Sequence, residues 1–426
     1  MPLDPVHVDP VHLDVARVRA QYPALLEGFA HFDGAAGTLV AARCAEAIAG
    51  VTGSAVANRS TAFVAGRRAI EIVDRARAAV ADLVGGSPAG VVFGQSATAL
   101  TYLVSRTLAD DWRPGDEVVV SRLDHDANIR PWVQAAARAG ATVRWAEFDP
   151  ATGELPAAQY RDLVTERTRV VAVTAASNAI GTCPDVPSIA AHARSVGALV
   201  YVDGVHRTPH GPVDVAALGA DFYVTSAYKW SGPHIAACVA DPVLWERLRP
   251  DKLVPSPDNV PDRFEQGTAS FELLAGVTGA VDHLADLLGE NADANAHMHV
   301  HAHANASEDG PDRRARIVAS MAAVDAYERQ LFDRLMRELR SIGDVAICPA
   351  PVGGCPTVAF RVGDEHPGQT AQRLGDRGIC VFAGDYYACE YFEAMGMRAS
   401  GGAVRASIYH YTTTDEVDRL VDAVRR

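Results

Sequence analysis

Two ionisable residues, Asp203 and Lys229, stand at positions from which they could act on one ligand. Asp203 ends the apolar run 198–203, and Lys229 follows closely after the apolar run 222–226. Because the carboxyl ends of neighbouring parallel strands meet at one edge of a sheet, we expect both side chains at a ligand-binding edge. Pyridoxal 5'-phosphate (PLP) requires such a pair: an amine that forms an imine with its aldehyde, and a carboxylate that keeps its ring nitrogen protonated. The pair therefore predicts a PLP site.

The segments around this pair alternate between short apolar strands and longer helical patterns. The expected strands are 91–93, 117–121, 142–148, 169–174, 198–203, 222–226 and 236–240, and the expected helices are 96–108, 127–139 and 186–196. This alternation predicts an α/β fold, in which a mostly parallel sheet is wrapped by helices.

A second, smaller unit is expected near the C-terminus. A long amphipathic helix at 313–342, strands at 345–362 and 378–382, and a last helix at 414–425 predict a small α+β domain. The expected division of the chain is an N-terminal segment that packs with the small domain (1–30), a large PLP-binding domain (31–285), a polar insertion (286–312) and the small domain (313–426).

The insertion is marked by alternating histidines, at His297, His299, His301 and His303. Such spacing would place imidazoles on one side of an extended strand, where they could hold a metal. The Asn, Ala, Asp and Gly residues around them favour a surface loop instead, so no metal site is expected.

The composition argues against several classes of protein. Lys plus Arg number 39 against 53 for Asp plus Glu, and the net charge of −14 disfavours nucleic acid as a partner. No apolar run reaches the ~18 residues that a membrane span needs. The acidic start, 1–14, does not resemble a secretory signal, so we expect a cytoplasmic protein without a membrane partner. The seven cysteines form no CxxC pair, which predicts buried, reduced thiols.

The stretch 198–233 resembles a known family. Its VDG at 202–204 and its SAYKWSGP at 226–233 are similar to the class V aminotransferase superfamily, in the branch of cysteine desulfurases and selenocysteine lyases, and the similarity runs over 32–424. The resemblance implies the PLP-dependent transferase fold type I, and a homodimer with a shared active site at the subunit interface. It also implies that Lys229 holds PLP as an imine and then acts as a base on the α-carbon of an amino-acid substrate.

Further segments resemble the cofactor-binding motifs of this family in the same order. The segment 93–98 is similar to the phosphate loop, so backbone N–H groups at Ser96 and Ala97 are expected to receive the phosphate. The segment 123–128 is similar to a motif whose histidine, here His125, stacks on the cofactor ring and shuttles protons.

The remaining cofactor contacts include two departures from the family pattern. Asn178 matches the asparagine that bonds the ring hydroxyl, and Ser226 matches a serine on the phosphate. His206 stands where desulfurases usually carry glutamine, and Tyr228 replaces the histidine that commonly precedes the lysine. Thr268 resembles the residue that reaches the partner subunit's phosphate, which makes the dimer part of the prediction.

Substrate contacts are expected from both ends of the chain. Ala35 belongs to a segment similar to the family's DNAA segment, and Arg405 matches the arginine whose planar fork binds the substrate carboxylate. The segment 382–388 aligns with the loop that carries the nucleophilic cysteine of desulfurases, and puts Tyr387 at the place of that cysteine. Tyrosine cannot carry a persulfide, and Cys389 lies two residues further on.

The preferred interpretation is a PLP-dependent amino-acid lyase that eliminates a C–S or other β-substituent from a small-molecule substrate. The alternatives are an aminotransferase or epimerase of the same superfamily, and a true cysteine desulfurase that uses Cys389. A PLP-binding protein without turnover is disfavoured, because it would need neither the imine-forming Lys229 nor a carboxylate clamp at Arg405.

Overall fold

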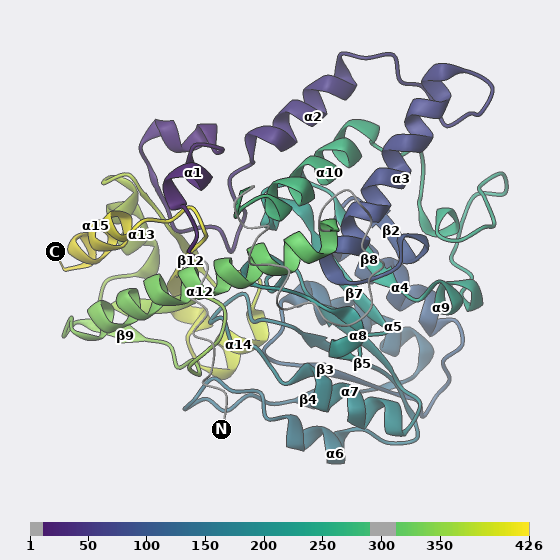
Figure 1. Cartoon of the computed structure of the whole chain (residues 1–426). Helices are drawn as coiled ribbons and strands as arrows, with labels where there is room; N and C mark the ends of the chain where they lie inside the picture. Colours follow the sequence, from purple (N-terminus) through teal and green to yellow (C-terminus); the bar gives the residue numbers. More distant parts are fainter. Residues whose placement is uncertain (1–11, 290–311, 426) are drawn as a thin grey trace, which may run out of the picture.

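A seven-stranded sheet forms the centre of the structure, a computed structural model that describes residues 12–289 and 312–425 (Figure 1). The strands are β2 (Val91–Gly94), β3 (Glu117–Ser121), β4 (Thr142–Ala146), β5 (Thr168–Thr174), β6 (Leu199–Asp203), β7 (Phe222–Ser226) and β8 (Ala236–Ala240). Their order in the sheet is β2-β8-β7-β6-β5-β3-β4. Neighbours from β7 to β4 are parallel, whereas β8 runs antiparallel to β2 and β7.

Helices cover both faces of this sheet. Side chains of α4 (Ala97–Ala109) and α5 (Arg130–Ala139) belong to the core on one face, and those of α3 (Val64–Val84), α7 (Val186–Ser195) and α10 (Phe271–Ala285) to the core on the other. Successive residues of a strand serve opposite faces, so Val118 and Val120 lie in one core and Val119 in the other. Because both faces are buried, the strands read as continuous apolar runs.

Shorter helices complete the large domain. They are α2 (Ala42–Thr52), which packs on α10, and α6 (Tyr160–Leu163), α8 (Val215–Leu218) and α9 (Pro242–Arg247).

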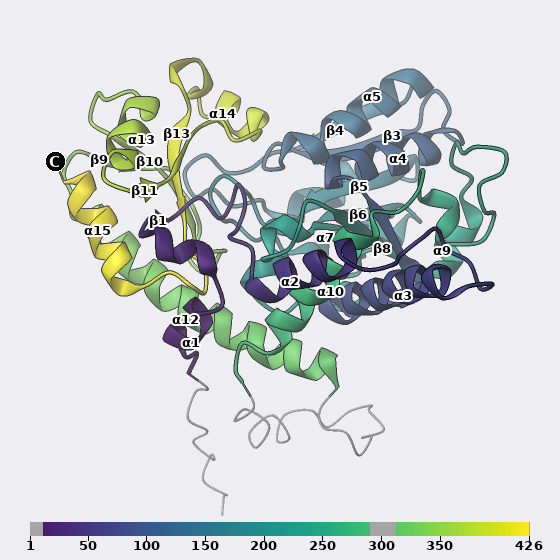
Figure 2. The same ribbon diagram turned by 90° about the horizontal axis from the view of Figure 1, so that it is seen from above.

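The C-terminal part forms a smaller domain around an antiparallel sheet in the order β12-β13-β10-β9. The strands are β9 (Val345–Ile347), β10 (Thr357–Val362), β12 (Phe382–Gly384) and β13 (Ala403–Ser407), and the helices are α13 (Pro367–Gly375), α14 (Cys389–Ala394) and α15 (Thr414–Val424). A further strand, β11 (Ile379–Cys380), pairs in parallel with β1 (Ala30–His31). Figure 2 shows this domain beside the large sheet.

The long helix α12 (Arg313–Arg340) runs along both domains (Figure 2). At its start Arg313 forms ion pairs with Asp82 and Asp282 of the large domain. Towards its end Leu335 is fully buried in the core of the small domain. The helix therefore connects the two cores.

The N-terminal helix α1 (Val15–Arg19) also contacts both parts of the chain. Arg19 forms an ion pair with Glu416 of α15 at 2.9 Å, and Arg17 donates to the carbonyl oxygen of Leu287.

The alternating histidines at 297–303, where the sequence predicted a surface loop, lie outside the described residues. Within the described ranges, no helix is long and apolar enough to cross a membrane.

The α/β fold expected from the sequence is confirmed, but several element boundaries were wrong. The strand expected at 345–362 is two strands, β9 and β10, because Pro349, Pro351 and Pro356 interrupt the segment and lack the N–H that a strand donates. The strand expected at 378–382 changes partner at Val381, from β1 to β13.

Two boundaries in the large domain also differ. β4 ends at Ala146 rather than at residue 148. The helix expected at 127–139 begins with a separate 3-10 turn, and α5 starts at Arg130 with Pro131 in its first turn, where proline is well tolerated.

Candidate active site

A cavity of about 550 Å³ lies at the carboxyl ends of the central strands, against the small domain. Its wall contains almost all of the site residues expected from the sequence: Ala35, Ser96, Ala97, His125, Asn178, Asp203, His206, Ser226, Tyr228, Lys229, Tyr387 and Arg405. Thr268 is not part of this wall, and its side chain is exposed. The chain thus brings together residues separated by up to several hundred positions.

The two residues that first suggested a PLP site are both buried at this cavity. Asp203 is the last residue of β6, and its Oδ1 accepts a hydrogen bond from the N–H of Val205. Lys229 ends a 3-10 turn directly after β7, the strand that pairs with β6. The parallel pairing of β6 with β7 is therefore what carries the carboxylate and the amine to the same edge of the sheet.

Burial brings the pKa values of the Lys229 amine and the Asp203 carboxyl group closer to neutral pH. Desolvation, reinforced by the charge of Arg405, lowers the pKa of Lys229 from 10.5 to about 7. Desolvation raises the pKa of Asp203 to about 6, against the hydrogen bond from Val205 and the charge of Lys229, which both lower it. An amine with this pKa is substantially uncharged near neutral pH, and only the uncharged form is a nucleophile.

The first turn of α4 forms one end of the cavity. Ser96 caps this helix, and its Oγ accepts from the N–H of Ala99. Within the described residues, the N–H groups of Ala97 and Thr98 have no hydrogen-bond partner. Ser226, at the end of β7, lies on the same cavity wall. Free N–H groups at a helix N-terminus beside a hydroxyl form a receptor for a phosphate dianion.

His125 lies on the wall in the neutral form. Burial, together with the charges of Lys229 and Arg405, lowers its pKa to about 3. Its Nδ1 accepts a hydrogen bond from the N–H of Ala127 at 3.0 Å, so the imidazole proton resides on Nε2. Its ring stacks against that of Tyr387, with a centroid separation of 5.4 Å and an angle of 27° between the planes.

Arg405 reaches the cavity from β13 of the small domain. Its side chain is only 2% exposed, and its Nη1 donates to the carbonyl oxygen of Asn178 at 2.9 Å. Its Nη2 lies 3.4 Å from Oδ1 of Asp33. These contacts hold the guanidinium across the boundary between the two domains.

The contacts that Asp33 and Tyr386 make with Arg405 were not expected from the sequence. Asp33 lies in the quoted segment 32–37, and its ion pair with Arg405 could not be read from spacing. The ring of Tyr386 packs against the guanidinium at 4.6 Å. Its hydroxyl donates to the carbonyl oxygen of Ala403. Tyr386 lies in the segment 382–388 that was aligned with the family's loop, but its packing against Arg405 could not be read from that alignment.

Three buried polar atoms on the wall have no partner among the described residues, namely Oδ1 of Asn178, Nδ1 of His206 and Nε of Arg405. Leaving such groups unpaired is costly, so a partner from outside the chain, such as water, an ion or a polar ligand, is expected at them. A cofactor with a ring hydroxyl and a substrate with a carboxylate would satisfy atoms of these types. Together with the amine, the carboxylate and the helix N-terminus, they fit PLP.

The segment 382–388, in which Tyr387 stands at the place of the desulfurase cysteine, has an unusual backbone. Tyr386 and Tyr387 both have positive φ, at 49° and 60°. The side chain of Tyr387 is 70% exposed and lies on the cavity wall. Cys389 begins α14 and does not line the cavity, and its Sγ donates to Asp385 at 3.6 Å. Burial and the charge of Asp385 raise the pKa of this thiol, which disfavours the thiolate.

The fold and the residues around this cavity define a protein of the PLP-dependent fold type I. The family model described as aminotransferase class V matches residues 30–307 and 315–420. The chain belongs to this family, whose members depend on PLP.

Individual relatives agree with this assignment. MT3887, an uncharacterized protein of Mycobacterium tuberculosis, is 37% identical over 412 residues, covering 96% of this chain and 98% of the relative. A probable cysteine desulfurase of Pseudomonas putida is 30% identical over 351 residues, covering 78% of this chain and 77% of the relative. The crystal structure of the cysteine desulfurase CsdA from Escherichia coli has a TM-score of 0.80 at 26% identity and covers 96% of this chain and 97% of that chain.

Proposed function

We propose that this protein is a PLP-dependent lyase that removes a sulfur-containing or other β-substituent from a small amino acid. The proposal rests chiefly on the buried amine of Lys229, which lies on one cavity wall with Asp203 and the carboxylate-binding group Arg405. When bound, PLP supplies an electron sink that stabilises negative charge at the substrate α-carbon. The residues of the chain supply the binding and proton transfer described next.

Lys229 is suited to two tasks. Because its pKa is lowered to about 7, its uncharged Nζ is available to attack the cofactor aldehyde at neutral pH. Once released, the same nitrogen is suited to take the α-proton from the substrate, since a base is most effective when its pKa lies near the working pH. With PLP bound, the buried carboxylate of Asp203 would complement a protonated ring nitrogen, and that ion pair would favour the charged form of both groups.

Arg405 is the group that would bind the substrate carboxylate. It is buried and held in place by Asn178 and Asp33, yet its Nε has no partner among the described residues. A preoriented guanidinium pays less side-chain entropy when it binds a carboxylate than a mobile side chain would. The substrate class is therefore an α-amino acid.

Two further groups on the cavity wall could donate a proton to a leaving group. His125 presents its Nε2–H, and Tyr387 carries a phenolic hydroxyl beside it. None of the cysteines of the chain lies on the wall of this cavity. Sulfur eliminated from a substrate would therefore leave in solution, instead of being collected as a persulfide on the protein.

The PLP-loaded protein tests this proposal by product analysis. We expect cysteine or cystine to yield pyruvate together with sulfide or another sulfur product. Alanine should yield no keto acid. Lys229→Ala should abolish turnover, whereas Lys252→Ala, which changes the other of the two lysines in the chain, should not. Transamination or racemisation without loss of the β-substituent would instead establish the aminotransferase or epimerase alternative.

A second candidate, cysteine desulfurase activity through Cys389, is favoured by the relatives that carry this name. It requires the loop before α14 to bring Cys389 into the cavity. Loss of sulfide release in Cys389→Ala would support this candidate, whereas unchanged release of sulfide and pyruvate would support the lyase.

We also propose that the protein is a homodimer with a shared active site and that it is cytoplasmic. Thr268 is exposed outside the cavity, as expected of a residue that serves the phosphate of a partner subunit. A Thr268→Ala variant should weaken PLP binding if the site is shared in a homodimer. The seven cysteines are free thiols, which supports a reducing, cytoplasmic environment.

A further inference from the structure

Two cysteines from distant parts of the chain lie in contact outside the candidate active site. Cys183 lies in the loop between β5 and α7, and Cys355 lies just before β10. The two residues are 172 positions apart in sequence. Their Sγ atoms lie 3.6 Å apart. Among the described residues, no other two cysteine sulfurs are in contact. A disulfide needs a sulfur separation of about 2.05 Å, so a small local adjustment would join them.

The backbone holds the two loops together independently of the thiols. The N–H of Cys355 donates to the carbonyl oxygen of Gly181 at 2.7 Å. Gly181 has a φ of 76°, and a Cβ at this position would lie 2.2 Å from the carbonyl oxygen of Cys355. A glycine is needed for this close approach. The sulfur contact is thus a consequence of how the two domains pack.

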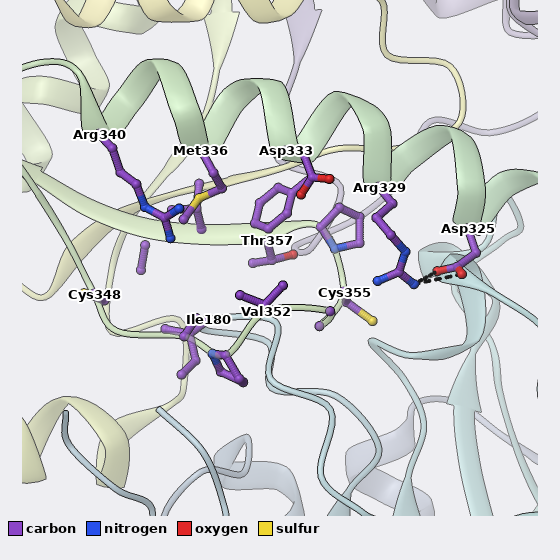
Figure 3. A pocket seen from close by; sticks show the side chains of 18 residues that line it. Ile180, Asp325, Arg329, Asp333, Met336, Arg340, Cys348, Val352, Cys355 and Thr357 are labelled. Atoms are coloured by element: carbon purple, nitrogen blue, oxygen red, sulfur yellow. Dashed lines mark hydrogen bonds and ion pairs between the residues drawn. The ribbon is translucent and has the colours of Figure 1, made fainter. Parts of the chain in front are cut away.

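The two thiols differ in their access to solvent. Cys183 is exposed, which departs from the buried thiols expected from the sequence, whereas Cys355 is 4% exposed. Cys355 also lies on the wall of a second cavity of about 140 Å³, between α12 and the segment 348–359 (Figure 3). Cys183 is thus the more accessible residue of the pair, so a small reagent is expected to reach it before Cys355.

The surroundings of the pair favour a thiolate at Cys183, chiefly through its hydrogen bond with Cys355. The hydrogen bond with Cys355 and the charge of Arg207 lower the pKa of Cys183, against burial and the charge of Asp325, which raise it. Hydrogen bonding with Cys183 and burial raise the pKa of Cys355. Arg207 has no ion-pair partner within the described part of the chain, so its charge is not neutralised locally. Asp325, in contrast, is paired with Arg329 (Figure 3).

We propose that Cys183 and Cys355 form a redox site that reacts with hydroperoxides and closes reversibly to a disulfide between the two domains. The Cys183 thiolate attacks the hydroperoxide and cleaves its O–O bond, so that a sulfenic acid forms and the leaving oxygen takes a proton as alcohol or water. The sulfur of Cys355 then attacks the sulfenic sulfur, loses its proton, and displaces hydroxide, which leaves as water. Two thiols are oxidised for each hydroperoxide reduced, and an external dithiol restores them.

The disulfide would tie together two segments that support the candidate active site. The loop before Cys183 carries Asn178, whose carbonyl oxygen holds Arg405. The strand after Cys355 carries Thr357, whose Oγ1 is hydrogen-bonded to Nε2 of His206 at 2.9 Å. The chemistry of the pair does not depend on PLP, so the inference stands apart from the proposed function.

The test treats the PLP-loaded protein with one equivalent of hydrogen peroxide and maps its thiols by mass spectrometry without reduction. We expect the wild-type protein to lose two thiols per chain, to yield one cross-linked peptide pair containing residues 183 and 355, and to recover both thiols with dithiothreitol. Because this readout uses the wild-type chain, it does not depend on the folding of any variant.

Three variants then assign the order of events. Cys355→Ser should stop at a sulfenic acid on Cys183 that dimedone traps, and Cys183→Ser should form neither product. Cys380→Ser, which changes a half-buried thiol elsewhere, should behave as the wild type. The inference is overturned if peroxide leaves all seven thiols intact, if the cross-link joins other cysteines, or if dimedone labels Cys389 in place of Cys183.

Discussion

The buried amine of Lys229 is expected to react with the cofactor aldehyde at a pH at which an ordinary lysine is almost inert. Burial lowers its pKa from 10.5 to about 7. At pH 7 about half of such an amine is uncharged, against roughly 0.03% of an amine with the ordinary pKa, so the reactive form is enriched by about three orders of magnitude. Lys252, half-buried and paired with Asp258 at 3.0 Å, supplies an internal comparison in the same chain.

The assay is the rate of covalent PLP attachment to the cofactor-free protein, followed by visible absorbance across neutral and alkaline pH. The logarithm of the rate should rise with pH and level off near the pKa of Lys229. Arg405→Gln removes a positive charge that lowers this pKa, so the plateau should move to higher pH. Asp33→Asn removes a negative charge that raises it, so the plateau should move to lower pH. A wild-type rate that keeps rising to the ordinary pKa of lysine, or two variants that shift in the same direction, would refute this reasoning.

Three further perturbations address the substrate, the proton donor and the small domain. Arg405→Lys should raise KM for the amino acid about 10- to 100-fold without altering the cofactor spectrum, because one charge-assisted hydrogen bond contributes roughly 1.5–3 kcal/mol. An unchanged KM in steady-state assays would contradict the proposed binding of the substrate carboxylate by Arg405. Tyr387→Phe keeps the ring that stacks on His125 but removes the hydroxyl, so kcat should fall on the order of 10²-fold at similar KM, and equal kcat values would leave Tyr387 as a wall residue only. Leu335→Ala opens a cavity in the core of the small domain. In urea titrations of the cofactor-free protein it should lower the free energy of unfolding by about 2–5 kcal/mol. A loss below about 1 kcal/mol would argue against tight packing around Leu335.

The parts of the site that lie at strand ends could be predicted from the sequence. Apolar runs long enough to be buried strands end at Asp203 and Ser226, and parallel pairing fixes where such ends meet. The helix that begins after Ser96 was expected for the same local reason, since serine is a good N-cap. Local pattern therefore predicted the positions of the amine, the carboxylate and this helix start, whereas the phosphate role of the helix start was expected from the family resemblance.

Contacts between the two domains could not be predicted in the same way. Arg405 meets Asn178 across 227 residues of sequence, and Cys183 meets Cys355 across 172. These pairs depend on how α12 joins the two cores, which no local periodicity encodes. The left-handed backbone of Tyr386 is a further example, because aromatic residues rarely adopt positive φ and nothing in the sequence marks the position.

A single labelling experiment tests the central claim most directly, because the chain contains only two lysines. The protein reconstituted with PLP is reduced with borohydride, digested, and mapped by mass spectrometry. We predict that the visible band disappears on reduction, that the pyridoxyl group is found on Lys229, and that Lys229→Ala abolishes both signals while Lys252→Ala preserves them. A protein that stays colourless, or a label that resides on Lys252, would contradict the assignment of the site.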